Sequence, residues 1–186
     1  MKEDQEAVAR ARRGDEAAYA ELLERYRDRV FSFLLRVVGE AGAAEDLAQD
    51  AFLKAFSSLD RYDPQRPFLS WVFKIAHNRA FDHLRARRVD LALDEPGGAL
   101  EVPDDAASPE DAAAAAFDRE LVEKALAAMP AGYREVLLLR HQEELEYSQI
   151  AEITGLPEGT VKIKLFRGRA MLKGKLEALG LAPQTK

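Results

Sequence analysis

The sequence predicts an all-α protein built as two small helical domains joined by a flexible acidic linker. Three observations predict this class. Apolar residues recur at intervals of three and four over most of the chain, which is the period of a helix with one buried face. The composition is rich in Ala, Leu, Glu and Arg, and 32% of the residues are charged. A stretch with glycines, prolines and acids but no apolar period separates the two periodic parts.

The first domain is expected over residues 1–88 and begins with two helices. Residues 3–13 predict a short helix that stops at Gly14, and Asp15 is a suitable N-cap for the next helix. That helix, from about Glu16 to Val38, ends at Gly39. Its apolar stripe is expected to contain Tyr19, Leu22, Leu23, Tyr26, Val30, Phe33, Leu34 and Val37.

Two more helices complete this domain. One, from about Ala43 to Ser58, carries on its apolar face Leu47, Ala51, Phe52, Ala55, Phe56 and Leu59, and on its polar face Glu45, Asp46, Gln49, Asp50 and Lys54. Residues 60–67 contain two prolines and break the helical pattern. The other helix, Phe68 to Arg88, carries on one face Leu69, Val72, Phe73, Ala76, Ala80 and Leu84. Its basic far end, with Arg85, Arg87 and Arg88, suits either the helix dipole or a phosphate, and the sequence leaves both roles open.

Residues 89–108 are the predicted linker, and residues 109–180 the predicted second domain. Ser108 is a suitable helix cap, with Pro109 at the first helical position. This helix is expected to reach about Ala128 and to stop before Pro130, and a short helix is expected from Tyr133 to Arg140.

The net charge of −6 is unevenly distributed. Residues 1–90 carry 16 basic and 16 acidic side chains, residues 91–118 carry eight acids and no base, and residues 119–186 carry 11 bases and nine acids. The acidity therefore belongs to the central segment, and the C-terminal part keeps a local positive field.

That positive field lies in residues 146–176, which predict two helices joined by a tight break. Gly155 can end the first helix in the left-handed conformation, and Pro157 suits the first turn of the second. The first helix presents Ile150, Ala151 and Ile153, and the second a buried stripe of Val161, Leu165, Ala170 and Leu172. From Pro157 to Lys175 there are six basic residues and one acid, Glu158. A helix, a short turn and a basic amphipathic helix form the shape that enters the DNA major groove, but an ordinary hairpin with a solvated basic face has the same pattern.

Five sequence motifs along the chain are informative when they are taken together. In order they are AEDLAQDAFLKAF (Ala44–Phe56), Pro67-Phe68 with Trp71, KIAHNRAFDHLR (Lys74–Arg85), MPAGYREVLLLR (Met129–Arg140) and IAEITGLPEGTVKIKLFRGRAML (150–172). Together they closely resemble the extracytoplasmic-function (ECF) group of the sigma-70 family, which are bacterial transcription initiation factors. The resemblance covers about residues 5–88 and 112–178. It implies a sigma region 2-like domain and a region 4-like helix-turn-helix domain that bind core RNA polymerase and direct it to promoters through the −10 and −35 elements.

The resemblance also implies roles for individual residues. Docking on the β′ clamp helices of polymerase is expected of Asp46, Gln49, Asp50 and Lys54. Recognition and opening of the −10 element are expected of Arg61, Asn78, Arg79, Arg85 and Arg88, with a flipped base held by the loop of residues 61–66. Contact with the −35 element is expected of Thr160, Lys162, Ile163, Lys164, Phe166 and Arg167. Part of the apolar surface near Tyr133, Val136 and Leu137 is expected to meet the β flap.

Five residues carry expectations of their own. Trp71 is assigned to the core, because large aromatic side chains bury well. Asp82 is expected to pair with arginines at helical spacing. Two residues depart from the pattern of the family that the chain resembles: Ile163 stands where Ser is common, so a polar contact is lost or replaced by an apolar one, and Glu146 stands where Ser or Thr usually caps the helix and is a poorer cap. Gly168 also weakens its helix by about 1 kcal/mol relative to Ala.

Several classes of function are disfavoured by the sequence. The absence of cysteine excludes disulfides and thiolate metal sites, the charged N-terminus is no signal peptide, and no apolar run approaches the roughly 18 residues of a membrane span. A cytoplasmic protein, nucleoid-associated when in holoenzyme, is expected. His77, His83 and His141 form no metal motif, so no cofactor, metal site or enzymatic activity is expected.

Two alternatives remain open from the residues alone. A stand-alone helix-turn-helix regulator would bind duplex DNA as a dimer without polymerase. A helical adapter would bind only other proteins. The resemblance additionally implies an anti-sigma factor as a partner.

Overall fold

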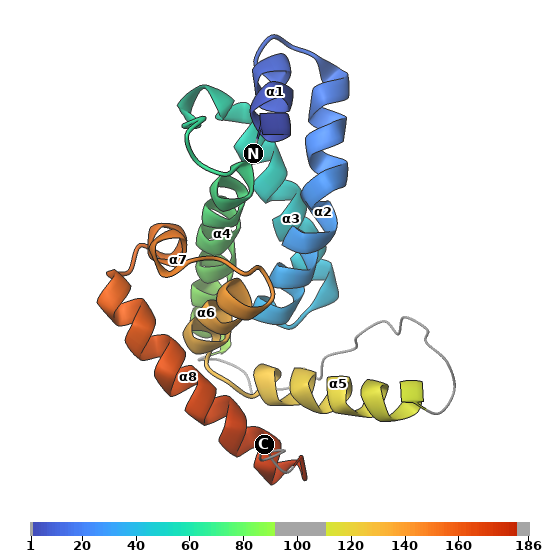
Figure 1. The fold of residues 1–186 in the computed structure, drawn as a ribbon, viewed down its shortest axis with the longest axis vertical. Helices are drawn as coiled ribbons and strands as arrows, with labels where there is room; N and C mark the ends of the chain where they lie inside the picture. Colours follow the sequence, from blue (N-terminus) through green and yellow to red (C-terminus); the bar gives the residue numbers. More distant parts are fainter. Residues whose placement is uncertain (1, 92–110, 182–186) are drawn as a thin grey trace. The chain divides into compact units, whose positions relative to one another are not determined.

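The computed structural model describes residues 2–91 and 111–181, and every regular element within these ranges is helical (Figure 1). The expected all-α class is therefore confirmed. The chain divides into two compact units, residues 1–97 with 152–155 and residues 98–151 with 156–186. The first three residues of the predicted linker, 89–91, belong to a helix that runs to Leu91, which corrects its predicted start at residue 89; the rest of the predicted linker and the predicted cap Ser108 lie outside the described residues.

The first unit contains four α-helices and one 3-10 turn. They are α1 (Lys2–Ala11), α2 (Glu16–Val38), α3 (Ala41–Ser57), η1 (Leu59–Arg61) and α4 (Phe68–Leu91). Helix α2 packs against α1, α3 and α4, and α3 also packs against α4 (Figure 1). The centre of this bundle is aromatic, because Phe33 and Phe73 are fully buried with their rings 5.0 Å apart and edge to face.

The ends of α2 form as the sequence predicts. Asp15 adopts an extended backbone, and its Oδ1 accepts hydrogen bonds from the backbone N–H groups of Ala17 and Ala18, at 3.0 and 3.4 Å. At the other end Gly39 has φ 82°, the left-handed conformation, and its N–H donates to the Leu35 carbonyl at 2.8 Å. Both predicted boundaries of this helix are confirmed.

One member of the predicted α2 stripe is wrong. Leu23 is 38% exposed, whereas its neighbour Leu22 is fully buried. Adjacent residues on a helix point about 100° apart, so a stripe centred on Leu22, Tyr26 and Val30 directs Leu23 toward solvent. Ala18 takes a buried position that the prediction did not include.

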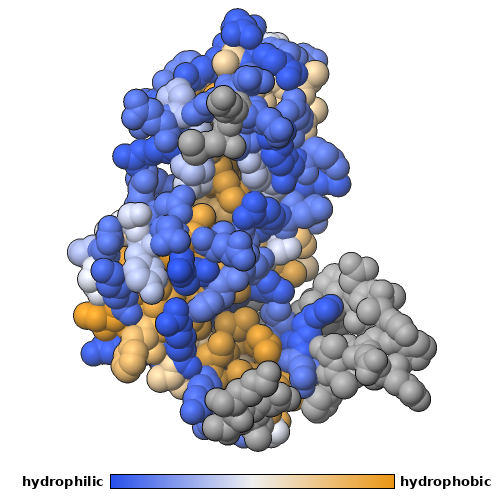
Figure 2. Space-filling view, in the orientation of Figure 1, coloured by the Kyte–Doolittle hydropathy of each residue, from blue (hydrophilic) through white to orange (hydrophobic). Residues whose placement is uncertain are grey.

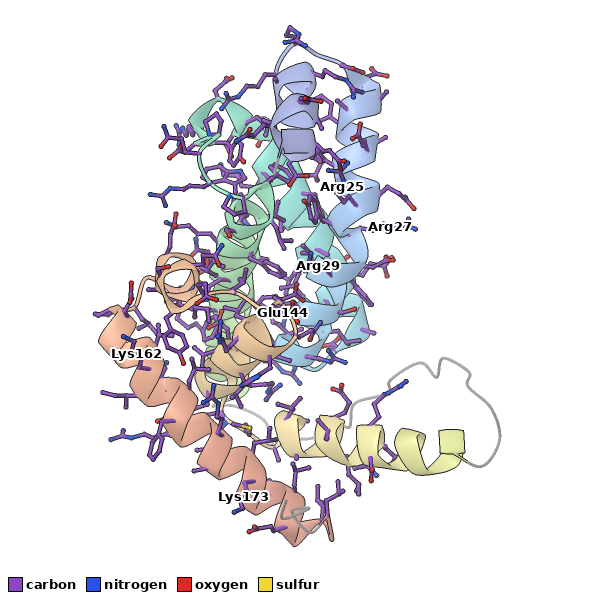
Figure 3. The ribbon with its side chains drawn as sticks, viewed as in Figure 1. Arg25, Arg27, Arg29, Glu144, Lys162 and Lys173 are labelled. Carbon is purple, nitrogen blue, oxygen red and sulfur yellow. The ribbon has the colours of Figure 1, made fainter. Side chains whose placement is uncertain are left out.

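Helix α1 is fastened to α2 by a buried carboxylate. Asp4 is only 7% exposed, and it accepts a hydrogen bond from the Tyr26 hydroxyl at 2.7 Å and another from Arg25 Nη1 at 2.5 Å. Arg25, labelled on α2 in Figure 3, also donates to Glu21 at 2.9 Å. Burial raises the pKa of the Tyr26 phenol, and its hydrogen bond to Asp4 raises this pKa further. A charge buried in this way is tolerated because it is fully partnered.

The second unit contains α5 (Asp111–Ala127), α6 (Ala131–His141), the first five residues of α7 (Tyr147–Thr154), and α8 (Glu158–Ala178). Helices α5 and α6 both pack against α8 (Figure 1). Val136, Leu139, Val161 and Leu165 are buried between them. Gly155, between α7 and α8, has φ 69°, which confirms the predicted left-handed break. None of the described helices is long and apolar enough to cross a membrane.

The second half of the predicted α8 stripe needs correction. Ala170 is exposed and Leu172 is half-buried, whereas Gly168 is buried. A Cβ atom on Gly168 would lie 3.4 Å from the Cγ and Cδ1 atoms of Leu137 on α6. Glycine at this position therefore lets α8 approach α6 closely, which gives a packing reason for a residue that otherwise weakens a helix.

Candidate functional site

The second unit presents an exposed basic and apolar face on α8. Lys162 and Arg167 are exposed, and so are two apolar side chains, Ile163 at 54% and Phe166 at 75%. They lie on the opposite side of the helix from the buried Val161 and Leu165. Figure 2 shows apolar surface among hydrophilic side chains in the region of α8. Thr160 and Lys164 are half-buried.

Two tyrosines hold the lysines of this face in place. The Tyr147 ring at the start of α7 lies near two cations, with Arg140 Cζ 5.1 Å and Lys162 Nζ 5.7 Å from its centroid. Lys164 Nζ lies 5.8 Å from the Tyr133 ring centroid. Figure 3 shows Lys162 near the start of α8 and Lys173 toward its end. The Lys164 side chain thus points toward Tyr133 of α6, whereas that of Lys162 points toward Tyr147 of α7. Sequence spacing did not predict that these two lysines have different partners.

A further contact fixes α8 to the end of α6. Arg169 Nε donates a hydrogen bond to His141 Nε2 at 3.2 Å. Burial lowers the pKa of His141, and the positive charges of Arg169 and Arg140 lower it further. The imidazole is therefore a neutral acceptor in this contact.

Two side-chain contacts fix Glu146 at the start of α7. The backbone N–H of Glu146 donates to Gln149 Oε1 at 2.9 Å, which is one of the two bonds of a capping box. The Glu146 carboxylate itself pairs with Arg140 Nη1 at 3.2 Å. Gln149 thus satisfies the backbone N–H of Glu146, which is a different donor from the N–H groups that a Ser or Thr cap would bind, and the sequence analysis did not identify this contact.

The first unit presents a different surface on α3. Asp46, Gln49, Asp50 and Lys54 are all exposed, as their place on the predicted polar face requires. Leu53 lies among them at helical spacing and is 61% exposed. The sequence analysis missed Leu53. The signal that identifies it is its spacing, because it falls outside the buried positions Ala48, Ala51 and Ala55.

The residues expected at the −10 element are spread along one long element. Arg61 lies in η1 before α4, whereas Asn78, Arg79 and Arg85 follow along α4. Arg61, Asn78 and Arg85 are exposed and Arg79 is half-buried, while the side chain of Arg88 lies outside the described part. From Phe68 to Arg85 the helix advances about 26 Å, so these residues form a track rather than a cluster.

Two nearby expectations concern Trp71 and Asp82. Trp71 is half-buried, with its ring 6.1 Å from that of Tyr62, so it packs without being a fully buried core residue. Asp82 pairs with Arg85 one turn further along α4, which confirms the expected ion pair with that arginine.

The loop of residues 61–66 has internal contacts that give it a defined shape. Asp63 Oδ1 accepts from the Gln65 N–H at 2.9 Å, and the Asp63 carboxylate pairs with Arg66 at 3.4 Å. The Tyr62 hydroxyl donates to the Arg66 carbonyl. Tyr62 is 3% exposed, and this burial raises the pKa of its phenol to about 12. The loop is thus anchored in the bundle by a neutral tyrosine.

Comparison with known proteins gives matches for both units. Residues 22–89 match the family described as Sigma-70 region 2, and residues 119–172 match Sigma-70, region 4. The ECF RNA polymerase sigma factor SigW of Bacillus subtilis (strain 168) is 31% identical over 179 residues, covering 92% of this chain and 96% of SigW. The chain belongs to the ECF RNA polymerase sigma factors. The ECF RNA polymerase sigma-E factor of Escherichia coli (strain K12) is also 31% identical, over 186 residues and 95% of each chain.

Solved structures agree with the fold of this sigma factor. CnrH, solved in complex with the cytosolic domain of CnrY, is 27% identical with a TM-score of 0.67, covering 95% of this chain and 98% of that one. The sigma factor RpoE of Bartonella quintana, solved with the anti-sigma factor NepR, has a TM-score of 0.72 at 23% identity, over 86% of this chain and 96% of that one. The resemblance predicted from the sequence is confirmed at the level of family and fold.

Proposed function

We propose that this sigma factor binds core RNA polymerase mainly through α3 and directs it to promoters through two DNA-contacting surfaces, one in each unit. The observation that supports this most directly is the chemistry of the exposed faces. Each unit matches a sigma region, and each exposes large apolar side chains within a polar helix face: Leu53 on α3, and Ile163 and Phe166 on α8. Exposed apolar groups rimmed by polar ones mark interaction sites.

The polymerase surface is proposed to consist of Asp46, Gln49, Asp50 and Lys54 around Leu53. An apolar centre within a polar rim is the usual anatomy of a protein interface. The rim is acidic on balance, which favours a basic partner such as the β′ clamp helices of polymerase. Leu53 would enter an apolar pocket, while the carboxylates would set orientation and partner choice.

The −10 surface is proposed to run from Arg61 along α4 through Asn78, Arg79 and Arg85 to Arg88. Melted DNA exposes bases, and proteins hold it with basic tracks and binding pockets. Asparagine can hydrogen-bond a base edge, and the arginines serve phosphates along the strand. The loop of residues 61–66, at the start of this track, would hold one flipped base.

The −35 surface is proposed to be α8 with Thr160, Lys162, Ile163, Lys164, Phe166 and Arg167. Arg167 and Lys162 are exposed and can reach bases or phosphates. Ile163 and Phe166 offer apolar contact, which suits a thymine methyl group. Lys164, held at Tyr133, is suited to a phosphate beside the start of α6 rather than to a base.

We further propose that an anti-sigma factor regulates this chain. Two similar structures support this, because CnrH was solved with a domain of CnrY and the Bartonella sigma factor with the anti-sigma factor NepR. The exposed leucine on α3 would then be covered in the inhibited complex. Coexpression with products of neighbouring genes, followed by transcription assays, tests this proposal. If none inhibits transcription, the proposal fails.

The main test combines core binding with transcription. The purified chain is mixed with core polymerase and analysed by gel filtration and by run-off transcription on a promoter library. Co-elution and selective initiation are expected, whereas a stand-alone regulator would elute separately and select no start site. Arg167→Glu should abolish selective initiation. Lys173→Glu is the matched control, because it makes the same charge change on the same helix outside the proposed surface (Figure 3). Equal loss in both variants would refute the α8 assignment.

A further inference from the structure

One arginine, Arg12, donates hydrogen bonds both to η1 and to the loop of residues 61–66 that follows it. The sequence analysis did not identify this residue. Arg12 lies in the turn after α1. Its Nε donates to the Leu59 carbonyl at 3.0 Å, and its Nη2 donates to the carbonyls of Leu59 and Tyr62 at 2.7 and 2.6 Å. The guanidinium thus joins η1 to the first residues of the loop.

Two more contacts extend this attachment. Gln5 Nε2 on α1 donates to the Pro64 carbonyl at 2.6 Å, at the middle of the loop. The Arg12 guanidinium also lies 6.0 Å from the centroid of the Tyr62 ring. The carbonyls of Leu59, Tyr62 and Pro64 are therefore satisfied by side chains of the N-terminal segment, in a region where the prolines limit regular hydrogen bonding.

The element that carries these donors is itself fixed. Asp4, one residue before Gln5, is buried and bonded to Tyr26 and Arg25 of α2. Moving α1 away from α2 would break the hydrogen bonds of the Asp4 carboxylate, so these bonds hold α1 in a fixed position beside the loop. Arginine suits the task, because its planar fork presents several donors in fixed geometry, whereas lysine presents a single mobile nitrogen.

We propose that Arg12 is a positioning residue for −10 recognition, acting by fixing the shape of the 61–66 loop rather than by touching DNA. This inference rests on the proposed function of that loop. If the loop holds a flipped base, its discrimination between bases depends on where its backbone lies. Loss of the Arg12 bonds should then reduce base discrimination more than it reduces polymerase binding.

The experiment uses the full chain with core polymerase and a duplex promoter selected from a library by the wild-type holoenzyme. Open-complex formation is measured on this promoter and on versions with single substitutions in the −10 element. Arg12→Ala, Arg12→Gln and Arg12→Lys are compared with Arg13→Ala, a neighbouring exposed arginine that forms no hydrogen bond with the described residues of the loop. Core affinity by competition and thermal unfolding are measured for every variant.

The expected result is a loss of discrimination between the selected and substituted promoters of about five- to tenfold in Arg12→Ala, with core affinity within about twofold of wild type. Arg12→Gln keeps one donor group, so its discrimination between promoters should lie between that of wild type and that of Arg12→Ala. Arg12→Lys should not restore discrimination, because it keeps the charge but loses the fork. Arg13→Ala should behave as wild type.

Other results would overturn the inference. Full rescue by Arg12→Lys would indicate general attraction of DNA by charge. Equal loss on all promoters, or a parallel loss of core affinity and thermal stability, would indicate a purely structural role. Failure of the proposed function is distinguishable, since the wild-type chain itself would then neither bind core polymerase nor open the selected promoter.

Discussion

Leu53 offers a direct test of the proposed polymerase surface. Leu53→Ala removes most of an exposed apolar side chain from the centre of the polar face of α3. Because the residue is 61% exposed, the substitution should change the free energy of unfolding by no more than about 0.5 kcal/mol. Any larger effect on polymerase binding must then come from the interface.

The size of that effect follows from the exposure. Complete burial of a leucine side chain is worth about 1.5–3 kcal/mol. With 61% of the residue still exposed in the free protein, roughly 1–2 kcal/mol remains to be gained on binding, which corresponds to a Kd change of roughly fivefold to thirtyfold. Leu53→Glu should weaken binding further, because it adds a carboxylate to a face already rich in acids.

The assay is competition for core polymerase against a labelled reference sigma factor, with thermal unfolding measured in parallel. Leu23→Ala is the matched control, since Leu23 is a second exposed leucine of the same unit, 38% exposed on α2 and outside the proposed surface. Unchanged affinity in Leu53→Ala, or an equal loss in Leu23→Ala, would refute the assignment of this face.

Three further predictions concern the fold and the −35 surface. Gly168→Ala should leave the free energy of unfolding within about 1 kcal/mol of wild type, because a better helix propensity opposes the tight approach to Leu137, whereas Gly168→Leu should cost about 1–3 kcal/mol, as measured by chemical denaturation. Above a pH of about 10 the free energy of unfolding should fall, since the phenols of Tyr26 and Tyr62 ionise in the unfolded chain while their raised pKa values keep them protonated in the fold; Tyr26→Phe should reduce this alkaline loss by the Tyr26 share, and an unchanged slope would contradict the burial of the Tyr26 phenol. In holoenzyme binding to −35 duplex DNA, Arg167→Ala should reduce the salt dependence by about 0.9 in log–log slope, while Ile163→Ala should weaken binding at an unchanged slope; an unchanged slope in Arg167→Ala would show that Arg167 does not contact a phosphate.

The sequence predicted most of the fold because local signals determine it. The ends of α2 follow from Asp15 and Gly39, and the break between α7 and α8 follows from Gly155, so each boundary is set by one residue with a known conformational preference. The errors have one physical source. Leu23 and Ala170 are apolar residues beside a stripe, and periodicity alone does not fix where a buried stripe ends.

The contacts that shape the candidate surfaces were much less predictable. Arg12 meets the carbonyl of Tyr62 across 50 positions of sequence, and Arg169 meets His141 across 28. Such pairs depend on how helices pack, which no local pattern specifies. Gly168 illustrates the same limit, because propensity marks it as a weakness and only the position of Leu137 shows its use.

The Tyr147 ring has a practical consequence for exchanging promoter preference between sigma factors. One aromatic side chain from α7 contacts a cation from α6 and a cation from α8, so Lys162 has a partner outside the helix that carries it. Grafting α8 alone onto another sigma factor would transfer its sequence without the Tyr147 contact of Lys162. The shortest segment to exchange is the stretch from Arg140 to Arg169. It contains the Tyr147 ring with both of its cations, and also His141, which accepts the hydrogen bond from Arg169 of α8.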